Sequence, residues 1–118
     1  MCIRDRHDPM EIRDRVDDVI KIGLQRAGIN RDQLSGIGIT NQRETSVVWN
    51  PETGQPYYNA IVWQDRRTAD YCSELKAAGY EEQVVGQTGL LLDSYFSATK
   101  LRWILDHVDA QRHRTRSR

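Results

Sequence analysis

The chain of 118 residues has few of the features that mark secreted, membrane-spanning or metal-binding proteins. Its two cysteines, Cys2 and Cys72, belong to no CxxC pair, and no histidine lies at metal-ligand spacing from either. Such cysteine usage is typical of a reducing cytoplasm. No apolar run approaches the roughly 18 residues of a membrane span, and the amino terminus contains no apolar signal-peptide core. We therefore expect a cytoplasmic protein with no membrane partner, in which Cys72 is a small core residue.

Common catalytic motifs are also missing from the sequence. There is neither a GxxxxGK[ST] phosphate loop nor a GxGxxG turn. The three histidines lie near the ends among polar residues, so no Ser/His/Asp set is indicated. The last nine residues, AQRHRTRSR, carry four arginines and no acid, but no aromatic residues interleave to stack on bases. Residues 110–118 are therefore expected to be a disordered basic tail without a nucleic-acid partner, although contact with nucleic acid through the tail stays an alternative.

The residues that are present predict one globular domain, because 38% are hydrophobic, 29% are charged and the net charge is zero. The first helix is the clearest element. Asp8-Pro9-Met10-Glu11 has the pattern of a capping box with proline at the first helical position. Gly28 is expected to end this helix. Its apolar residues recur at helical spacing and predict one apolar face: Ile12, Val16, Val19, Ile20 and Leu24.

Residues 36–63 predict strands. GIGIT, residues 36–40, has the β-branched pattern of a short buried strand, and a helix followed closely by such a strand favours an α/β fold. Residues 45–49 and 60–63 are the expected arms of a hairpin whose turn is NPETG. Pro56 makes the second arm irregular, which is typical of an edge.

Two further helices are expected in the rest of the chain. One runs from about Thr68 to Ala78 and ends at Gly79, with a buried face of Tyr71, Cys72, Leu75 and Ala78. Residues 81–85 form a short turn or helix, and GQTGLLLDSYFS, residues 86–97, is expected to be a loop. The last helix starts near Ser97, with Lys100 and Arg102 on its outer side. Its apolar stripe is Leu101, Ile104, Leu105 and Val108.

Polar residues gather where these apolar elements end. Arg43 and Glu44 follow residues 36–40, Trp63 precedes the polar run 64–67, and Tyr95 lies before the last helix. Small ligands bind where strands end in open α/β sheets. An arginine that donates and a glutamate that accepts hydrogen bonds suit a ligand rich in hydroxyls, with Trp63 as a flat wall. Adjacent strand residues point to opposite faces, however, so spacing alone leaves open two unrelated charges and a core tryptophan.

Three longer segments resemble the glycerol kinases of the FGGY carbohydrate kinase family. They are HDPMEI, IGITNQRETSVVWNPETGQPYYNAIVWQDRRTAD and TGLLLDSYFSATKLRWILDHV, and together they cover about residues 7–109. ITNQRET followed by NAIVWQDRR at this spacing is specific to that branch of the family. The resemblance implies part of an actin-like, ribonuclease H-like N-terminal domain with an incomplete sheet.

The resemblance also implies an activity, a site and partners. The family's enzymes transfer the γ-phosphoryl group of Mg-ATP to a hydroxyl, here the terminal hydroxyl of glycerol, and the complete enzyme is expected to be a homo-oligomer. Arg43 and Glu44 match the family's pair of residues that hydrogen-bonds glycerol. Trp63 matches the aromatic wall beside the glycerol carbons, and Tyr95 matches a tyrosine that also contacts glycerol. Alternatives are another FGGY kinase for a larger polyol, or a stand-alone binding module.

The sequence departs from the family at both ends. Residues 1–6, MCIRDR, stand where the family has a strand and a DxGTTS-like phosphate loop, and we expect this segment to be foreign. The family's catalytic aspartate, in a GDQ motif, lies beyond residue 118. We therefore expect no catalytic residue in the chain and no kinase activity from it alone. With the first strands of the sheet missing, Ile37 and Ile39 would lie on an unpaired edge.

Overall fold

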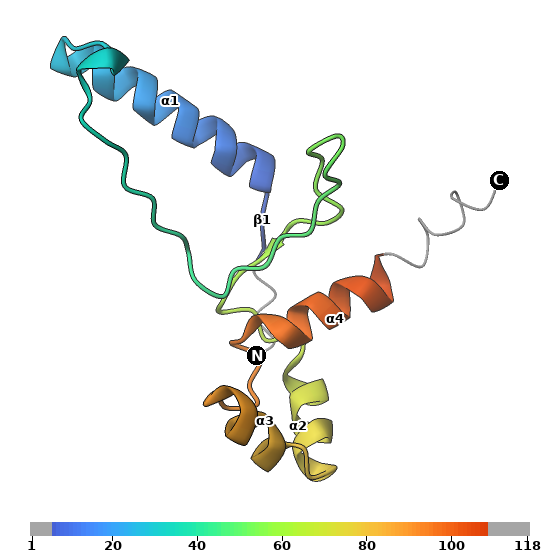
Figure 1. The fold of residues 1–118 in the computed structure, drawn as a ribbon. Coiled ribbons are helices and arrows are strands. Elements are labelled where there is room, and N and C mark those ends of the chain that lie inside the picture. The colour runs from blue at the N-terminus through green and yellow to red at the C-terminus, as the bar shows by residue number, and fades with distance from the viewer. Residues whose placement is uncertain (1–5, 109–118) are drawn as a thin grey trace.

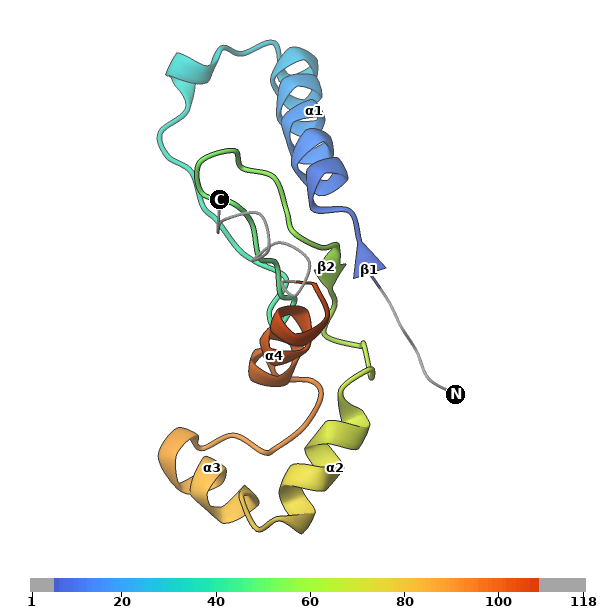
Figure 2. The ribbon, with the colours of Figure 1, turned by 90° about the vertical axis from the view of Figure 1, so that its right-hand side faces the viewer.

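A computed structural model describes residues 6–108 of the chain. Helix α1 lies at one end of the molecule and α2 and α3 lie at the other, with α4 between them (Figures 1 and 2). No helix in the described part is long and apolar enough to cross a membrane. In chain order the elements are β1 Arg6–His7, α1 Pro9–Ala27, the 3-10 turn η1 Arg31–Gln33, β2 Ala60–Ile61, α2 Ala69–Ala77, α3 Glu81–Thr88 and α4 Ser97–His107.

Both predicted ends of α1 are confirmed. The Asp8 carboxylate accepts a hydrogen bond from the Met10 amide at 2.8 Å, so it caps one of the helix's unpaired amides. Gly28 ends the helix with φ of 65°, a left-handed conformation that glycine adopts at little cost. The predicted capping box is not completed, because Glu11 Oε1 lies 3.6 Å from Arg15 Nη2 and pairs with that side chain instead.

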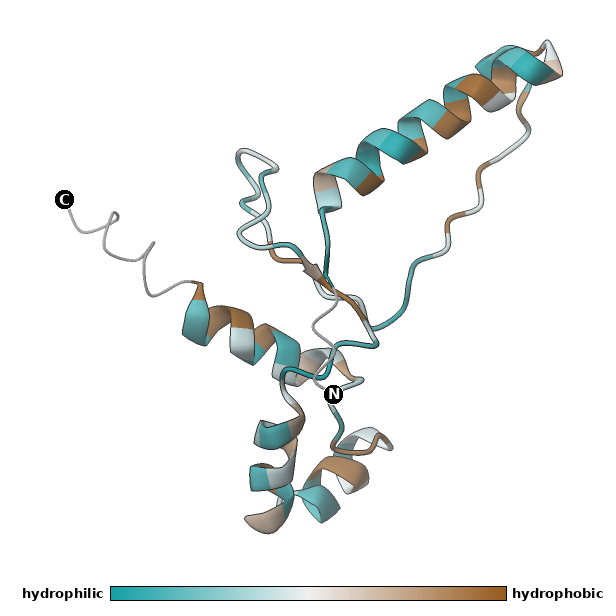
Figure 3. Cartoon of the chain, turned by 180° about the vertical axis from the view of Figure 1, so that it is seen from behind, coloured by the Kyte–Doolittle hydropathy of each residue, from teal (hydrophilic) through white to brown (hydrophobic). Residues whose placement is uncertain are grey.

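The apolar face of α1 is present but uncovered. None of the helix's residues is buried, and Figure 3 shows hydrophobic patches repeating along α1 and into the connection that follows it. Local sequence signals therefore formed this helix without a packing partner in the described chain. Its stability consequently rests on its caps and its own hydrogen bonds.

The prediction of a buried strand at residues 36–40 is wrong. The segment is part of the long irregular connection between η1 and the hairpin (Figure 1), and Ile37 and Ile39 are 85% and 93% exposed. A strand needs a neighbour to receive its backbone hydrogen bonds, and none lies beside this segment within residues 6–108. The sheet that does form is small, with antiparallel β1 and β2 pairing Arg6 with Ile61 and His7 with Ala60.

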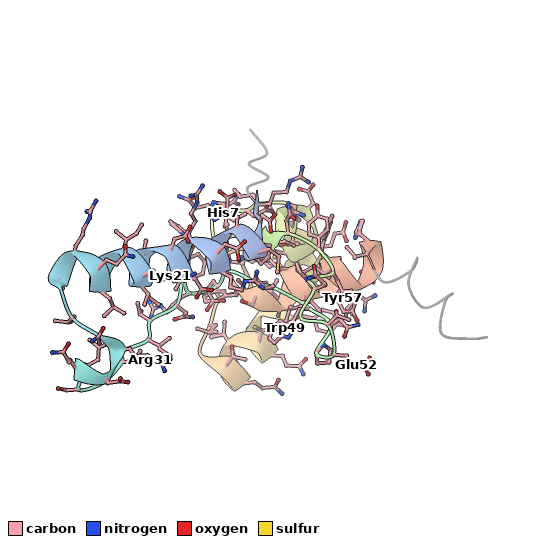
Figure 4. The ribbon with its side chains drawn as sticks, turned by 90° about the horizontal axis from the view of Figure 1, so that it is seen from above. His7, Lys21, Arg31, Trp49, Glu52 and Tyr57 are labelled. Carbon is pink, nitrogen blue, oxygen red and sulfur yellow. The ribbon has the colours of Figure 1, made fainter. Side chains whose placement is uncertain are left out.

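The predicted hairpin is confirmed. The Asn50 side chain accepts hydrogen bonds from the amides of Glu52 and Thr53, and Gly54 has φ of 69°. The arms pair through isolated bridges, Ser46 with Ile61 and Trp49 with Pro56, rather than through a continuous ladder. Figure 4 shows Trp49, Glu52 and Tyr57 of this hairpin well away from Arg31 at the far end of the connection.

Helices α2 and α3 form a helical hairpin, and both views show them side by side (Figures 1 and 2). The predicted buried face of α2 is partly wrong, since Cys72 is buried whereas Tyr71 and Ala78 are exposed. The α2–α3 hairpin projects from the rest of the molecule (Figures 1 and 2), which leaves most of the α2 surface uncovered. Helix α3 continues to Thr88, so the predicted loop begins at Gly89 rather than Gly86.

The predicted orientation of α4 is wrong. Lys100, expected on the outer side, is completely buried, whereas Leu101 and Leu105 are exposed. Ile104 faces inward as predicted. The helix is turned because the Lys100 ammonium finds two backbone carbonyls in the interior, at Glu44 and Tyr95. The buried apolar residues, which form a small core beside β2, are Ala60, Ile61, Val62, Cys72, Leu92 and Ile104.

Candidate functional site

Three of the four predicted site residues line one hollow. Arg43, Trp63 and Tyr95 come from the segment before the hairpin, from its second arm and from the loop before α4, and with Asn41 and Gln42 they enclose about 290 Å³. We call this the Trp63 hollow. Such a volume suits a small molecule, and its lining combines aromatic faces with charged and amide groups.

The aromatic side of the hollow is a pair of rings. The centroids of Trp63 and Tyr95 lie 6.0 Å apart with an interplanar angle of 66°, and Tyr95 in turn meets Phe96 edge-on at 5.2 Å. These are favourable edge-to-face arrangements, which fix the ring orientations. Trp63 is 41% exposed, so it is not a core residue and can present a ring face to a ligand.

Arg43 and Glu44 are adjacent in sequence, but their side chains have different surroundings in the structure. The Arg43 side chain is exposed and lines the hollow. Glu44 Oε2 instead accepts hydrogen bonds from the Ser97 amide at 3.0 Å and the Ser97 hydroxyl at 2.9 Å, at the start of α4. Glu44 is not among the residues that line the Trp63 hollow, so its contact with a ligand stays a prediction.

Glu44 also has an unusual backbone. Its φ is 59°, and among the described residues it is the only one other than glycine with positive φ. An L-residue in this left-handed region costs of the order of 1–3 kcal/mol and persists where its surroundings impose it. The contacts with α4 supply that constraint at the edge of the hollow.

Lys100 contacts the backbone next to the Trp63 hollow from the interior of the protein. Its Nζ donates hydrogen bonds to the backbone carbonyl oxygens of Glu44, at 2.7 Å, and of Tyr95. Burial lowers the pKa of Lys100, and the carboxylates of Glu44, Asp65 and Asp93 oppose that effect. Sequence patterns place Lys100 on the outer side of the helix because lysine is usually solvated. One signal was available, since Lys100 lies four residues before buried Ile104 and therefore shares its helix face.

The polar run after Trp63 turns inward. Asp65 accepts three hydrogen bonds from Arg67, namely from its backbone amide, Nε and Nη2, at 2.8–2.9 Å. Both side chains are nearly completely buried, and the Arg67 guanidinium lies 4.4 Å from the Trp103 ring centroid. These residues hold the turn that positions Trp63, whereas Gln64 and Arg66 are exposed.

The same ion pair perturbs its neighbours' protonation. Burial alone would lower the pKa of Arg67, but hydrogen bonds to Asp65 and Tyr58 raise it overall. The hydrogen bond from Arg67 lowers the pKa of Tyr58. The cluster therefore keeps Arg67 charged in a water-poor environment, which is a scaffolding property rather than an acid–base one.

Residues 6–108 contain no group of three or more histidine, cysteine, aspartate or glutamate side chains that could hold a metal ion. What the arrangement can do chemically is to bind a small hydroxylated molecule in the Trp63 hollow, with a cationic donor on one side and aromatic rings on the other.

Comparison with known proteins defines the class. Residues 3–117 match the profile of the FGGY family of carbohydrate kinases, N-terminal domain, and the chain belongs to this family. The glycerol kinase of Vibrio campbellii is 61% identical over 106 residues, or 90% of this chain and 21% of the relative. That of Paraburkholderia phytofirmans is 58% identical over 110 residues, covering 93% and 22%. The chain thus spans about a fifth of the length of these curated relatives.

A solved structure agrees with the sequence comparison. The crystal structure of Plasmodium falciparum glycerol kinase with ADP matches with a TM-score of 0.84 and 32% identity, covering 97% of this chain and 24% of that one. The predicted family resemblance is confirmed, and with it the α/β fold class as part of an actin-like, ribonuclease H-like domain. The domain limits at residues 7 and 109 stay predictions. Two further predictions, a disordered tail at 110–118 and a foreign segment at 1–6, fall entirely or almost entirely outside the described residues.

Proposed function

We propose that this chain forms part of the acceptor site of an ATP-dependent glycerol kinase, which transfers the γ-phosphoryl group of ATP to a terminal hydroxyl of glycerol. The observation that carries the proposal is the convergence of Arg43, Trp63 and Tyr95, from three separate segments, on one hollow of glycerol-compatible size. The relatives at 58–61% identity, all named glycerol kinase, favour glycerol over a larger polyol.

Each residue has a role that its chemistry allows. The Arg43 guanidinium donates hydrogen bonds to glycerol oxygens, the Tyr95 hydroxyl adds another polar contact, and the Trp63 indole covers the carbon chain. Glu44, held by Ser97 through one oxygen, would accept from a glycerol hydroxyl through its carboxylate. A donor or acceptor left unpaired costs roughly 1–3 kcal/mol, so a ligand lacking a hydroxyl would be discriminated against.

ATP and Mg²⁺ enter this proposal through the family, and we place no ligand of either on residues 6–108. They supply the phosphoryl group and neutralise its charge when bound. The relative's structure holds ADP, which supports nucleotide use by the complete enzyme. The proposal includes a cytoplasmic, homo-oligomeric parent enzyme without a nucleic-acid partner, and no turnover by the 118-residue chain alone.

A segment exchange tests the proposal. Residues 7–108 replace the matching segment of the Vibrio campbellii glycerol kinase, to which the chain is 61% identical. We expect ATP-dependent phosphorylation of glycerol, with erythritol and xylulose as poorer acceptors. Preference for xylulose or erythritol would instead indicate another FGGY kinase, and loss of all activity in a folded hybrid would contradict the proposal.

Arg43→Leu in that hybrid probes the hollow directly. Loss of a charged hydrogen bond to substrate, worth about 1.5–3 kcal/mol, lowers kcat/KM about ten- to a hundred-fold. Arg66→Leu is the matched control, because Arg66 is an exposed arginine near Trp63 that does not line the hollow. If both substitutions lower kcat/KM equally, Arg43 is not a residue of the glycerol site.

A further inference from the structure

Lys100 is buried in a way that its helix does not explain. The residue is 0% exposed, and it forms no ion pair within residues 6–108. An ammonium group taken out of water is strongly unfavourable unless hydrogen bonds replace its hydration. The neighbouring positions Leu101 and Arg102 are both exposed, so the helix buries a cation while it leaves an apolar residue in solvent.

The hydrogen bonds that compensate this burial join two segments of the candidate site. Lys100 Nζ donates to the carbonyl oxygen of Glu44 at 2.7 Å and to that of Tyr95. A backbone carbonyl is bonded rigidly to its own Cα, so these contacts fix where both side chains begin. The ammonium also lies 5.9 Å from the Tyr95 ring centroid, within cation–π range.

Ser97, one turn earlier on α4, completes the arrangement. Its amide and hydroxyl both bind Glu44 Oε2, so α4 holds Glu44 by the side chain as well as by the main chain. This doubly held residue is the one with φ of 59°. A left-handed glutamate persists where its surroundings over-determine it, and α4 provides that constraint.

We propose that Lys100 is a positioning residue for polyol binding, tying residues 44 and 95 together so that Arg43 and Tyr95 face Trp63 across the hollow. Lys100 touches no ligand in this arrangement and acts through the backbone of two segments. The functional meaning of the proposal rests on the proposed glycerol site. Its geometric content, a clamp between two segments, can be measured without any ligand.

The first experiment uses the unmodified 118-residue chain labelled with ¹⁵N. A buried, hydrogen-bonded Lys100 ammonium exchanges its protons slowly, so it should give a resolved signal at low temperature with NOEs to the Glu44 and Tyr95 backbones. NOEs between the Trp63 and Tyr95 rings are expected in the same sample. A fast-exchanging, solvent-like Lys100 amine would overturn the proposal.

Three variants then separate positioning from general stability. Lys100→Met keeps an unbranched side chain of similar length but removes the donors, and Lys100→Arg keeps donors. Ile104→Ala removes a buried residue from the same helix face without removing either hydrogen bond of Lys100. We expect Lys100→Met to lose the Trp63–Tyr95 NOEs. We also expect it to weaken glycerol binding, followed by the chemical shift of the Trp63 indole, about tenfold or more. Lys100→Arg should restore part of both, and Ile104→Ala should retain them.

The two readouts keep the two proposals apart. If ring contacts depend on Lys100 but the Trp63 indole does not respond to glycerol in any variant, the clamp stands and the glycerol assignment fails. If Lys100→Met keeps both the NOEs and the glycerol titration, or if Ile104→Ala loses them equally, Lys100 has no positioning role. If Lys100→Met does not fold, the Lys100 ammonium signal of the unmodified chain and the NOEs and glycerol titration of Lys100→Arg decide whether Lys100 has a positioning role.

Discussion

Asp65 and Arg67 form an ion pair almost completely removed from water, with side chains 0% and 3% exposed. Asp65→Ala leaves a guanidinium buried against Trp103 without its carboxylate, and breaking a buried pair this way destabilises a protein by about 3–5 kcal/mol. We expect a loss of that size in the free energy of unfolding, measured by urea denaturation.

Asp106→Ala is the matched control for this prediction. Asp106 pairs with Arg102 on the same molecule at the same 2.8 Å distance, but both side chains are exposed to solvent. Exposed pairs contribute little, because water screens them and both side chains lose freedom. A destabilisation by Asp106→Ala as large as that by Asp65→Ala would show that burial of the Asp65 pair is not what matters.

Cys72 allows a test of the small core beside β2. Burial raises the pKa of its thiol, with hydrogen bonds involving Thr99 and Thr68 opposing the effect. The thiolate is the reactive form, so Cys72 should react with Ellman's reagent much more slowly in the folded chain than in urea. A Cys2→Ser background leaves Cys72 as the only thiol, and equal rates in both states would contradict the burial of this residue.

The same pKa shift predicts a pH dependence. Because the folded-state pKa lies above the unfolded value, the thiol's contribution to stability is fully present below the unfolded pKa. It is lost as the pH rises from that value through the raised one. The stability difference between wild type and Cys72→Ala should therefore shift against the wild type at alkaline pH, and a pH-independent difference would refute the shift.

Helix α1 is the element whose stability depends most directly on local sequence, because it buries none of its residues. Asp8→Ala removes the side chain that accepts from the Met10 amide, and loss of such a cap costs about 1 kcal/mol. We expect faster hydrogen exchange throughout α1. Asp8→Asn is the control, since asparagine caps equally well, and a similar loss with Asn would point to charge rather than capping.

The helices show how far local signals reach. The caps of α1 and the end of α2 shortly before Gly79 followed from individual residues whose preferences are local. The face that α4 buries did not, because periodicity treats a lysine as solvated and cannot see carbonyls contributed by Glu44 and Tyr95. The same limit applies to the site, where Arg43, Trp63 and Tyr95 were predicted but Lys100 and Ser97 were not.

The described part of the chain has an open shape. Its radius of gyration is 18.8 Å, whereas a compact domain of this length has about 13 Å. The openness leaves apolar residues uncovered on α1 and in the connection after it (Figure 3). An exposed apolar segment with strand-like sequence is a template for pairing between molecules, and residues 36–40 have that character.

Self-association is therefore expected to depend on Ile37 and Ile39. Replacing both with lysine should reduce association, as measured by sedimentation velocity, because charges on an open edge oppose pairing between strands. Replacing Leu90 and Leu91, two other exposed apolar residues, with lysine is the control. If both double variants reduce association equally, general hydrophobicity rather than residues 36–40 drives it.

The sequence by itself determined the positions of the α1, α2 and α4 starts, the turn at Asn50–Gly54 and the family, because caps, turn residues and the ITNQRET and NAIVWQDRR motifs are local in the chain. Tertiary structure decided that residues 36–40 carry no strand, that the Glu44 carboxylate binds Ser97 and that Lys100 is buried. Each of these outcomes depends on a partner distant in sequence: a missing strand neighbour, the start of α4, and two backbone carbonyls. Local patterns carry no information about such partners, so only the folded chain could reveal them.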